Sequence, residues 1–152
     1  MAAVTALVCF IKRKCQLLFM EMGGQETVPA NEFAVYADEL AEIVKLGGLN
    51  CLTAIDARGD MPIRRAALFY DFLGAVLEKV VKNQFNNALV NMLSEDGRME
   101  LRIMLPREAL GFDTFEELHY AAQAENGTFE LLDLHDRAGL ILSFPEGGGP
   151  DA

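Results

Sequence analysis

The chain has 152 residues, a formal net charge of −10 and a pI near 4.6, and 51% of its residues are hydrophobic. Phosphate backbones repel so acidic a chain, which argues against nucleic acid or an anionic membrane as the main partner. The length fits one domain with an appended helix, and the apolar fraction is enough for a substantial core.

The first predicted element is a helix over residues 4–22, ended by Gly23-Gly24. Its apolar residues recur at roughly helical period: Leu7, Phe10, Ile11, Leu17, Leu18 and Met22. Water is a poor environment for a stripe of this size, so we expect this helix to pair with a second copy or with an upstream segment of the same protein. The alternative is that it packs back onto the chain's own domain.

The N-terminal apolar run is followed by Lys12-Arg13-Lys14. A secretory signal has the opposite order of charge and apolar residues, and a membrane span needs about twenty apolar residues. We therefore expect a cytoplasmic protein, or the cytosolic part of a membrane-anchored sensor. The basic triplet is either a solvated turn of the helix or a juxtamembrane patch.

The three cysteines, Cys9, Cys15 and Cys51, are widely spaced and odd in number. They show no spacing typical of zinc ligands and no even-numbered disulfide framework. The sequence therefore predicts reduced thiols and no metal site.

A polar loop is expected up to residue 30, followed by a helix over residues 32–46 and a strand over residues 49–57. Arg58-Gly59-Asp60 then forms a turn. A helix over residues 62–83 is apolar on most sides, which is typical of a central helix packed on a sheet. The residues expected to face that sheet are Phe69, Leu73, Val76, Leu77 and Val80.

Residues 88–93 and 99–105 are expected to pair as a hairpin across a turn at 94–97, which contains Asp96-Gly97. Pro106 should break the second strand. Thr114 and Glu117 form a capping box that opens a helix to about residue 124. A last hairpin is expected from strands at 128–134 and 139–144, joined at 135–138.

The order is helix, helix, strand, helix, two strands, helix, two strands, without strict alternation. It predicts an α+β two-layer sandwich with a mixed sheet of about five strands. The expected division is an N-terminal helix over 1–24, a sandwich domain over 25–148 and a flexible tail over 149–152.

Four segments carry a resemblance to a known family: residues 11–18 (IKRKCQLL), 39–51, 70–78 (YDFLGAVLE) and 127–145. In their order they resemble the dimerisation helix and the ATP-binding domain of sensor histidine kinases, a GHKL-type ATPase fold. The resemblance covers residues 8–148. It implies a histidine-kinase ATPase-like sandwich behind a remnant of the dimerisation helix, and a place in two-component signal transduction in bacteria.

The same resemblance assigns the nucleotide site. Residues 70–78 match the family's N box, whose Asn holds the magnesium that bridges the ATP phosphates; Ala75 stands at that position and has no ligand atom. Asp71 matches the acidic or amide position one turn earlier and is the weak catalytic candidate, and Glu78 completes this degenerate region. The family's adenine-binding D-x-G-x-G should follow residue 105, but residues 106–111 (PREALG) contain no Asp.

Neither histidine, His119 or His135, lies on the first helix, where the family carries its phosphoacceptor. We therefore expect a degenerate, non-catalytic histidine-kinase-like signalling module that acts through protein–protein contacts and binds no cofactor. The alternative is a functional kinase domain that binds ATP and Mg and transfers phosphate to a response regulator. The expected partners are a second copy or an upstream membrane sensor segment at the first helix, with a response regulator as a further candidate.

Overall fold

The structure is a computed structural model and describes residues 2–56, 58–83, 87–110 and 115–145. The elements are α1 (Ala2–Met22), β1 (Thr27–Pro29), α2 (Ala30–Leu46), β2 (Asn50–Asp56), β3 (Asp60–Pro62), α3 (Ile63–Lys82), β4 (Asn87–Glu95), β5 (Arg98–Pro106), the 3-10 helix η1 (Arg107–Leu110), α4 (Glu116–Ala124), β6 (Thr128–Leu134) and β7 (Arg137–Pro145). The tail expected over 149–152 lies outside the described residues.

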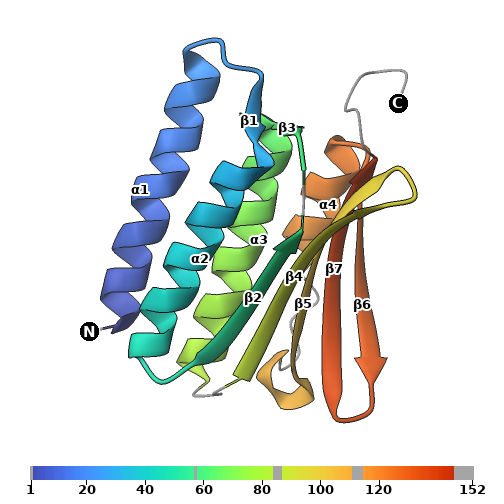
Figure 1. Cartoon of the computed structure of the whole chain (residues 1–152). Coiled ribbons are helices and arrows are strands. Elements are labelled where there is room, and N and C mark those ends of the chain that lie inside the picture. The colour runs from blue at the N-terminus through green and yellow to red at the C-terminus, as the bar shows by residue number, and fades with distance from the viewer. Residues whose placement is uncertain (1, 57, 84–86, 111–114, 146–152) are drawn as a thin grey trace.

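Five strands form one mixed sheet in the order β2-β4-β5-β7-β6. β2 pairs with β4 in parallel, and the remaining neighbours are antiparallel. The helices α2, α3 and α4 lie on one face of this sheet, and α1 lies outside them against α2 and α3 (Figure 1). The α+β sandwich with a mixed five-stranded sheet is therefore confirmed.

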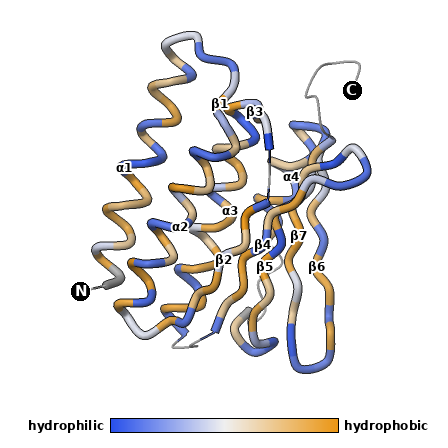
Figure 2. The backbone as a smooth tube through the Cα atoms, in the orientation of Figure 1, coloured by the Kyte–Doolittle hydropathy of each residue, from blue (hydrophilic) through white to orange (hydrophobic). Residues whose placement is uncertain are grey.

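The centre of the core is α3, whose apolar residues repeat with the period of a helix (Figure 2). All five residues expected to face the sheet are at most 2% exposed. The ring of Phe69 contacts Phe144 of β7 edge-on at a centroid distance of 5.2 Å, and Phe72 contacts Phe129 of β6 at 5.7 Å. Burial of large rings on both sides of the helix–sheet boundary holds the two layers together.

Residues 27–29 and 60–62 form a second, two-stranded sheet that the sequence analysis did not predict. Val28 opposes Met61, and both side chains are buried. Ala30 N donates to Gly59 O, and Ile63 N donates to Glu26 O, so this ribbon joins the first residues of α2 and α3. The segment expected to be a polar loop up to residue 30 contains β1. The turn expected at 58–60 leads into β3. Strands of three residues are too short to show an alternating pattern.

The hairpin turns are shorter than predicted. Glu95 still pairs with Arg98, so the first turn is Asp96-Gly97 alone; both residues have positive φ, as this turn type requires. Leu134 pairs with Arg137, which leaves His135-Asp136 as the second turn. Pro106 does not break β5 but ends it, at a position where a missing N–H is tolerated.

The helix α4 begins at Glu116, later than expected, and its N-cap residue is Phe115 in a left-handed conformation. The predicted capping residue Thr114 lies outside the described residues. At the other end, α4 ends at Ala124 as expected, and Gly127 N donates to Ala122 O at 2.7 Å just beyond it.

Candidate functional site

The three residues that the resemblance assigns to the N box, Asp71, Ala75 and Glu78, lie on α3 but do not converge on one point. The carboxylate of Asp71 forms an ion pair with Lys14 of α1, with Nζ and Oδ2 2.5 Å apart. Ala75 and Glu78 are exposed. Among the described residues, no group of three or more His, Cys, Asp or Glu side chains is placed to hold a metal ion. The ion pair gives Asp71 a structural partner on the neighbouring helix.

The segment after β5, where the resemblance places the adenine contact, is η1. Asn83, just beyond the end of α3, donates through Nδ2 to Ala109 O at 3.1 Å, and Ala109 is fully buried. Arg107 is paired with Asp133 of β6 at 2.7 Å. These contacts fasten η1 to α3 on one side and to the last hairpin on the other.

Aromatic rings fill the space between α3, α4 and β6. Phe115 lies 5.8 Å from Phe129, and His119 meets the same ring edge-on at 4.7 Å. The ammonium group of Lys79 lies over the Phe115 ring at 5.2 Å. His119 therefore packs against an aromatic side chain. The sequence alone did not predict this cluster, because Phe72, Phe115 and Phe129 lie in three separate segments of the chain.

The inner face of α1 is fitted closely to α2 and α3. Phe10 stacks on Tyr70 with centroids 5.1 Å apart and planes 8° apart, and Leu17 is only 2% exposed. Directly beneath Phe10 is Gly74, where any added Cβ would lie 2.5 Å from the ring. This helix thus packs onto the chain's own sandwich, which was the alternative retained in the sequence analysis.

Polar side chains of Cys9, Arg13 and Glu39 form a cluster between α1 and α2. Glu39 of α2 accepts hydrogen bonds from Arg13 and from the Cys9 thiol, the latter at 2.8 Å. The bond from Arg13, followed by the bond from Cys9, lowers the pKa of Glu39. Burial and the contact with Glu39 raise the pKa of Cys9 to about 11, so its thiol is protonated and unreactive at neutral pH.

The outer face of α1 is apolar as well. Six of its exposed residues recur at alternating intervals of four and three: Val4, Val8, Ile11, Cys15, Leu18 and Met22. The apolar residues among them are 44% to 81% exposed. This is the heptad pattern of a coiled-coil interface, and we call these six residues the outer seam. The single stripe expected from sequence is thus divided, with Phe10 and Leu17 inside and Ile11 and Leu18 outside.

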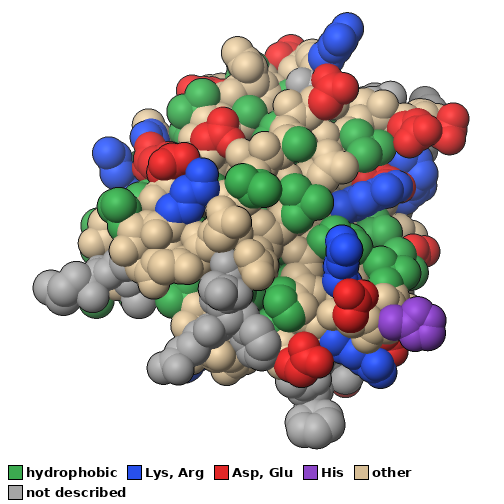
Figure 3. Space-filling view, turned by 60° about the horizontal axis from the view of Figure 1, so that its bottom comes forward, with side chains coloured by type: hydrophobic (Ala, Val, Ile, Leu, Met, Phe, Trp, Pro, Cys, Tyr) green, Lys and Arg blue, Asp and Glu red, His purple; other side chains and the backbone are tan. Residues whose placement is uncertain are grey.

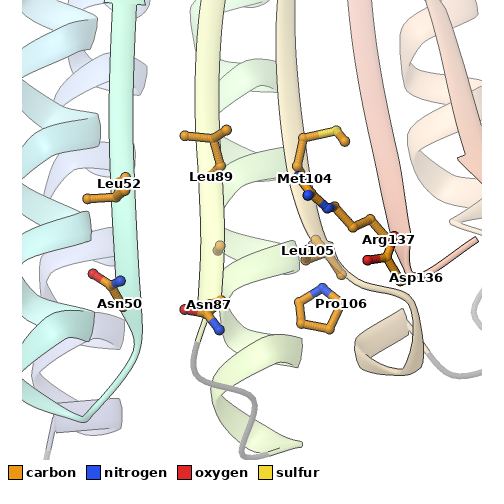
Figure 4. A pocket seen from close by; sticks show the side chains of 10 residues that line it. Asn50, Leu52, Asn87, Leu89, Met104, Leu105, Pro106, Asp136 and Arg137 are labelled. Atoms are coloured by element: carbon orange, nitrogen blue, oxygen red, sulfur yellow. The ribbon is translucent and has the colours of Figure 1, made fainter. Parts of the chain in front are cut away.

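The open face of the sheet carries a row of apolar residues across all five strands. Register places Leu52, Leu89, Met104, Gly139 and Leu132 side by side. A shallow cavity of about 330 Å³ lies on this face, with Leu52, Leu89 and Met104 at its floor and the polar side chains of Asn50, Asn87, Asp136 and Arg137 around it (Figure 4).

Seen from below, charges of both signs are interspersed with hydrophobic side chains on the surface of the molecule (Figure 3). None of the described helices is long and apolar enough to cross a membrane.

No family model matches the sequence, and no curated protein matches it. Solved structures do match the fold. A histidine kinase domain from the Erythrobacter litoralis EL346 blue-light activated histidine kinase superposes with a TM-score of 0.65 at 13% identity, covering 92% of this chain and 74% of that one. The Acinetobacter baumannii histidine kinase AdeS gives 0.57 at 13% identity, covering 89% and 76%. A bacterial phosphotransferase gives 0.56 at 12% identity, covering 76% and 64%. The histidine-kinase ATPase-like fold is therefore confirmed.

Proposed function

We propose that this chain is a histidine-kinase-like signalling module that acts through protein–protein contacts and has lost ATP-dependent catalysis. The fold supports a kinase-like module. The observation that carries the loss of catalysis is on α3, where Ala75 stands at the position of the magnesium-holding Asn and offers only a methyl group. Magnesium requires oxygen ligands, and methyl cannot replace one.

Contacts elsewhere in the region that the resemblance assigns to the nucleotide support the same proposal. The segment that would supply the adenine contact is fastened to Asn83 and Asp133, and rings occupy the space between α3 and α4. A charge-assisted hydrogen bond that the nucleotide cannot form weakens its binding by about 1.5–3 kcal/mol, so the absence of two or three raises the dissociation constant by several orders of magnitude.

Calorimetry with ATP and magnesium tests this proposal. We expect no saturable heat at about 1 mM nucleotide, because that concentration would already detect binding energies near 4 kcal/mol. The variant Ala75→Asn serves as the matched comparison, since it restores one oxygen ligand. A micromolar dissociation constant for the unmodified chain would overturn the proposal. It would favour the alternative of an ATP-binding kinase domain that passes phosphate to a response regulator.

The second part of the proposal is that the protein–protein contact is a homodimer formed through the outer seam. The seam keeps heptad spacing along the whole of α1 and lies opposite the face that packs on α2 and α3. A second copy offers an identical, self-complementary stripe, as two-fold pairing requires. The competing occupant of the outer seam is an upstream membrane sensor segment of the same protein. In that case the chain would be the cytosolic part of a membrane-anchored sensor.

Light scattering on the intact chain and on Ile11→Glu/Leu18→Glu decides between these occupants. The unmodified chain should be a dimer at about 100 μM and the double variant a monomer with unchanged circular dichroism, because each glutamate places a charge in the apolar interface. Val35→Glu, which alters an equally exposed apolar residue on α2, should remain dimeric. A monomeric unmodified chain would refute the homodimer and leave the seam to an upstream segment.

The pairing direction has its own readout at Cys15, an exposed residue of the seam. A parallel, in-register pair brings the two Cys15 residues within reach of a disulfide, whereas an antiparallel pair separates them. Mild oxidation should therefore cross-link the dimer through Cys15 in the first case. Cys15→Ser is the control that removes the cross-link without changing the size of the assembly.

A further inference from the structure

A second cavity lies at the N-terminal end of α3, before the residues that the resemblance assigns to the N box. It has a volume of about 300 Å³ and is bounded by β3, by the first turn of α3 and by the ends of β5 and β7. Arg65 lines it and precedes Ala75 by ten residues on α3, so the two positions are about 15 Å apart along the helix axis. This cavity is thus separate from the region where the fold family places its nucleotide.

Arg65 is the only charged residue among the described ones that is buried, with 7% of its surface exposed. Its guanidinium group donates to the backbone carbonyls of Pro145 and Glu125 and lies 5.4 Å from the centre of the Phe144 ring. No carboxylate of the described residues is within ion-pair distance of it. Two carbonyl contacts leave several of its five N–H donors without an acceptor, and the Glu125 carboxylate, which attracts its charge, forms no ion pair with it.

A second guanidinium group borders the same cavity. Arg58 precedes β3 and makes no hydrogen bond or ion pair with any residue that the structure describes. Asp60 also borders the cavity but is paired with neither arginine. In a chain with 23 carboxylates and only 13 lysines and arginines, two arginines without a carboxylate partner at one cavity need an explanation.

The rest of the wall is apolar. Pro62, Met99 and Pro145 line the cavity with partly accessible apolar atoms, whereas Phe69 and Phe144 are at most 1% exposed. A cavity of this volume is at the lower end of the range that holds small organic ligands, which combine apolar walls with a few placed polar groups. Guanidinium groups match the planar, two-oxygen face of a carboxylate or phosphate.

We propose that this cavity binds a small organic oxyanion: a carboxylate or phosphate group held by Arg65 and Arg58, with an apolar or aromatic body against Met99, Pro62 and Pro145. The site does not depend on the proposed loss of catalysis. Its ligand would contact β3 and the first turn of α3 together, and hence the ribbon that joins the starts of α2 and α3.

NMR titration of the full chain with phenyl phosphate and with benzoate tests the proposal. We expect saturable shifts confined to residues 58–65, Met99 and residues 144–145. Inorganic phosphate should bind at least tenfold more weakly because it lacks the apolar body, and benzyl alcohol should not bind because it lacks the charge. Equal binding of benzyl alcohol, or the absence of saturable shifts with both anions, would overturn the proposal.

Variants separate a binding role from a folding role. Arg58→Gln changes an exposed side chain and should weaken anion binding at least fivefold while the chain remains folded. Arg64→Gln is the matched control, because Arg64 is the neighbouring arginine of the first turn but pairs with Glu21 and does not line the cavity; its affinity should change less than twofold. Equal weakening in both variants would mean general electrostatic attraction and refute the site. If anions bind only after Glu146→Gln, the cavity belongs to the chain's own carboxylate and the proposal is wrong.

Discussion

The packing of α1 on α3 depends on the space above Gly74, and Gly74→Ala removes that space. The added Cβ would lie 2.5 Å from Cε2 and 2.6 Å from Cδ2 of Phe10. Carbon atoms prefer separations of about 3.5–4.0 Å, so the ring must move by about 1 Å. It cannot move freely, because its other contact is the parallel stack on Tyr70.

The magnitude follows from two opposing terms. Overpacking of this kind costs about 1–3 kcal/mol, while replacing glycine by alanine inside a helix gains about 0.8–1.0 kcal/mol. We therefore expect Gly74→Ala to destabilise the chain by about 1 kcal/mol. In a Phe10→Ala background the clash is absent, so the same substitution should stabilise it by up to about 1 kcal/mol.

Urea unfolding of the four chains in this double-mutant cycle, followed by circular dichroism, measures the coupling. The reversal of sign between the two backgrounds is the diagnostic result, because a purely local effect on the helix has the same sign in both. If Gly74→Ala stabilises the chain when Phe10 is present, α1 does not pack on α3 as described.

Three further outcomes are expected. Glu39→Gln should lower the free energy of unfolding by about 1 kcal/mol at pH 7 and by little at pH 3. The fold lowers the pKa of Glu39, so the stability that its carboxylate contributes is present above the ordinary carboxyl pKa and is lost as pH falls through the folded pKa. An equal loss of stability in urea unfolding at both pH values would contradict this. Gly127→Ala should destabilise the chain by about 2 kcal/mol or more, because the added Cβ would lie 2.4 Å from the Phe144 ring and 2.7 Å from Ser143 O. Gly23→Ala is the control: the nearest atom to its added Cβ is at 3.4 Å, so thermal stability should change little. In the monomeric Ile11→Glu/Leu18→Glu variant, a thiol reagent at pH 8 should label Cys15 first, since burial raises the pKa of both Cys9 and Cys51 to about 11. Fast labelling of all three cysteines would refute the burial of Cys9 and Cys51.

Local patterns were sufficient wherever one short segment contains its own signal. The apolar period of α3 predicted both its position and its buried face, since a helix with apolar residues on most sides must lie in a core. Asp96-Gly97 marked the first hairpin because its two residues accept the positive φ that the turn needs. The element order then predicted the sandwich, and Ala75 was recognisable as a position without a ligand atom.

Other features depend on segments that meet only in the folded chain. The residues of α1 looked like one apolar stripe, because helical period alone does not tell a face that packs on α2 and α3 from one that remains exposed. Phe10 and Leu17 pack against α2 and α3, whereas Ile11 and Leu18 remain exposed, and only the folded surface of α2 and α3 decides which residues are covered. The pairing of Asp71 with Lys14 likewise follows from that docking.

The two arginines at the start of α3 show the same limit. In the sequence Arg64 and Arg65 are equivalent basic residues at the start of a helix, yet one pairs with Glu21 near the surface and the other is buried against Phe144. Sequence by itself determined the order and type of most elements, because these depend on residue type and local spacing. Burial and charge pairing were decided by tertiary structure, because they depend on which atoms the rest of the chain brings within a few ångströms.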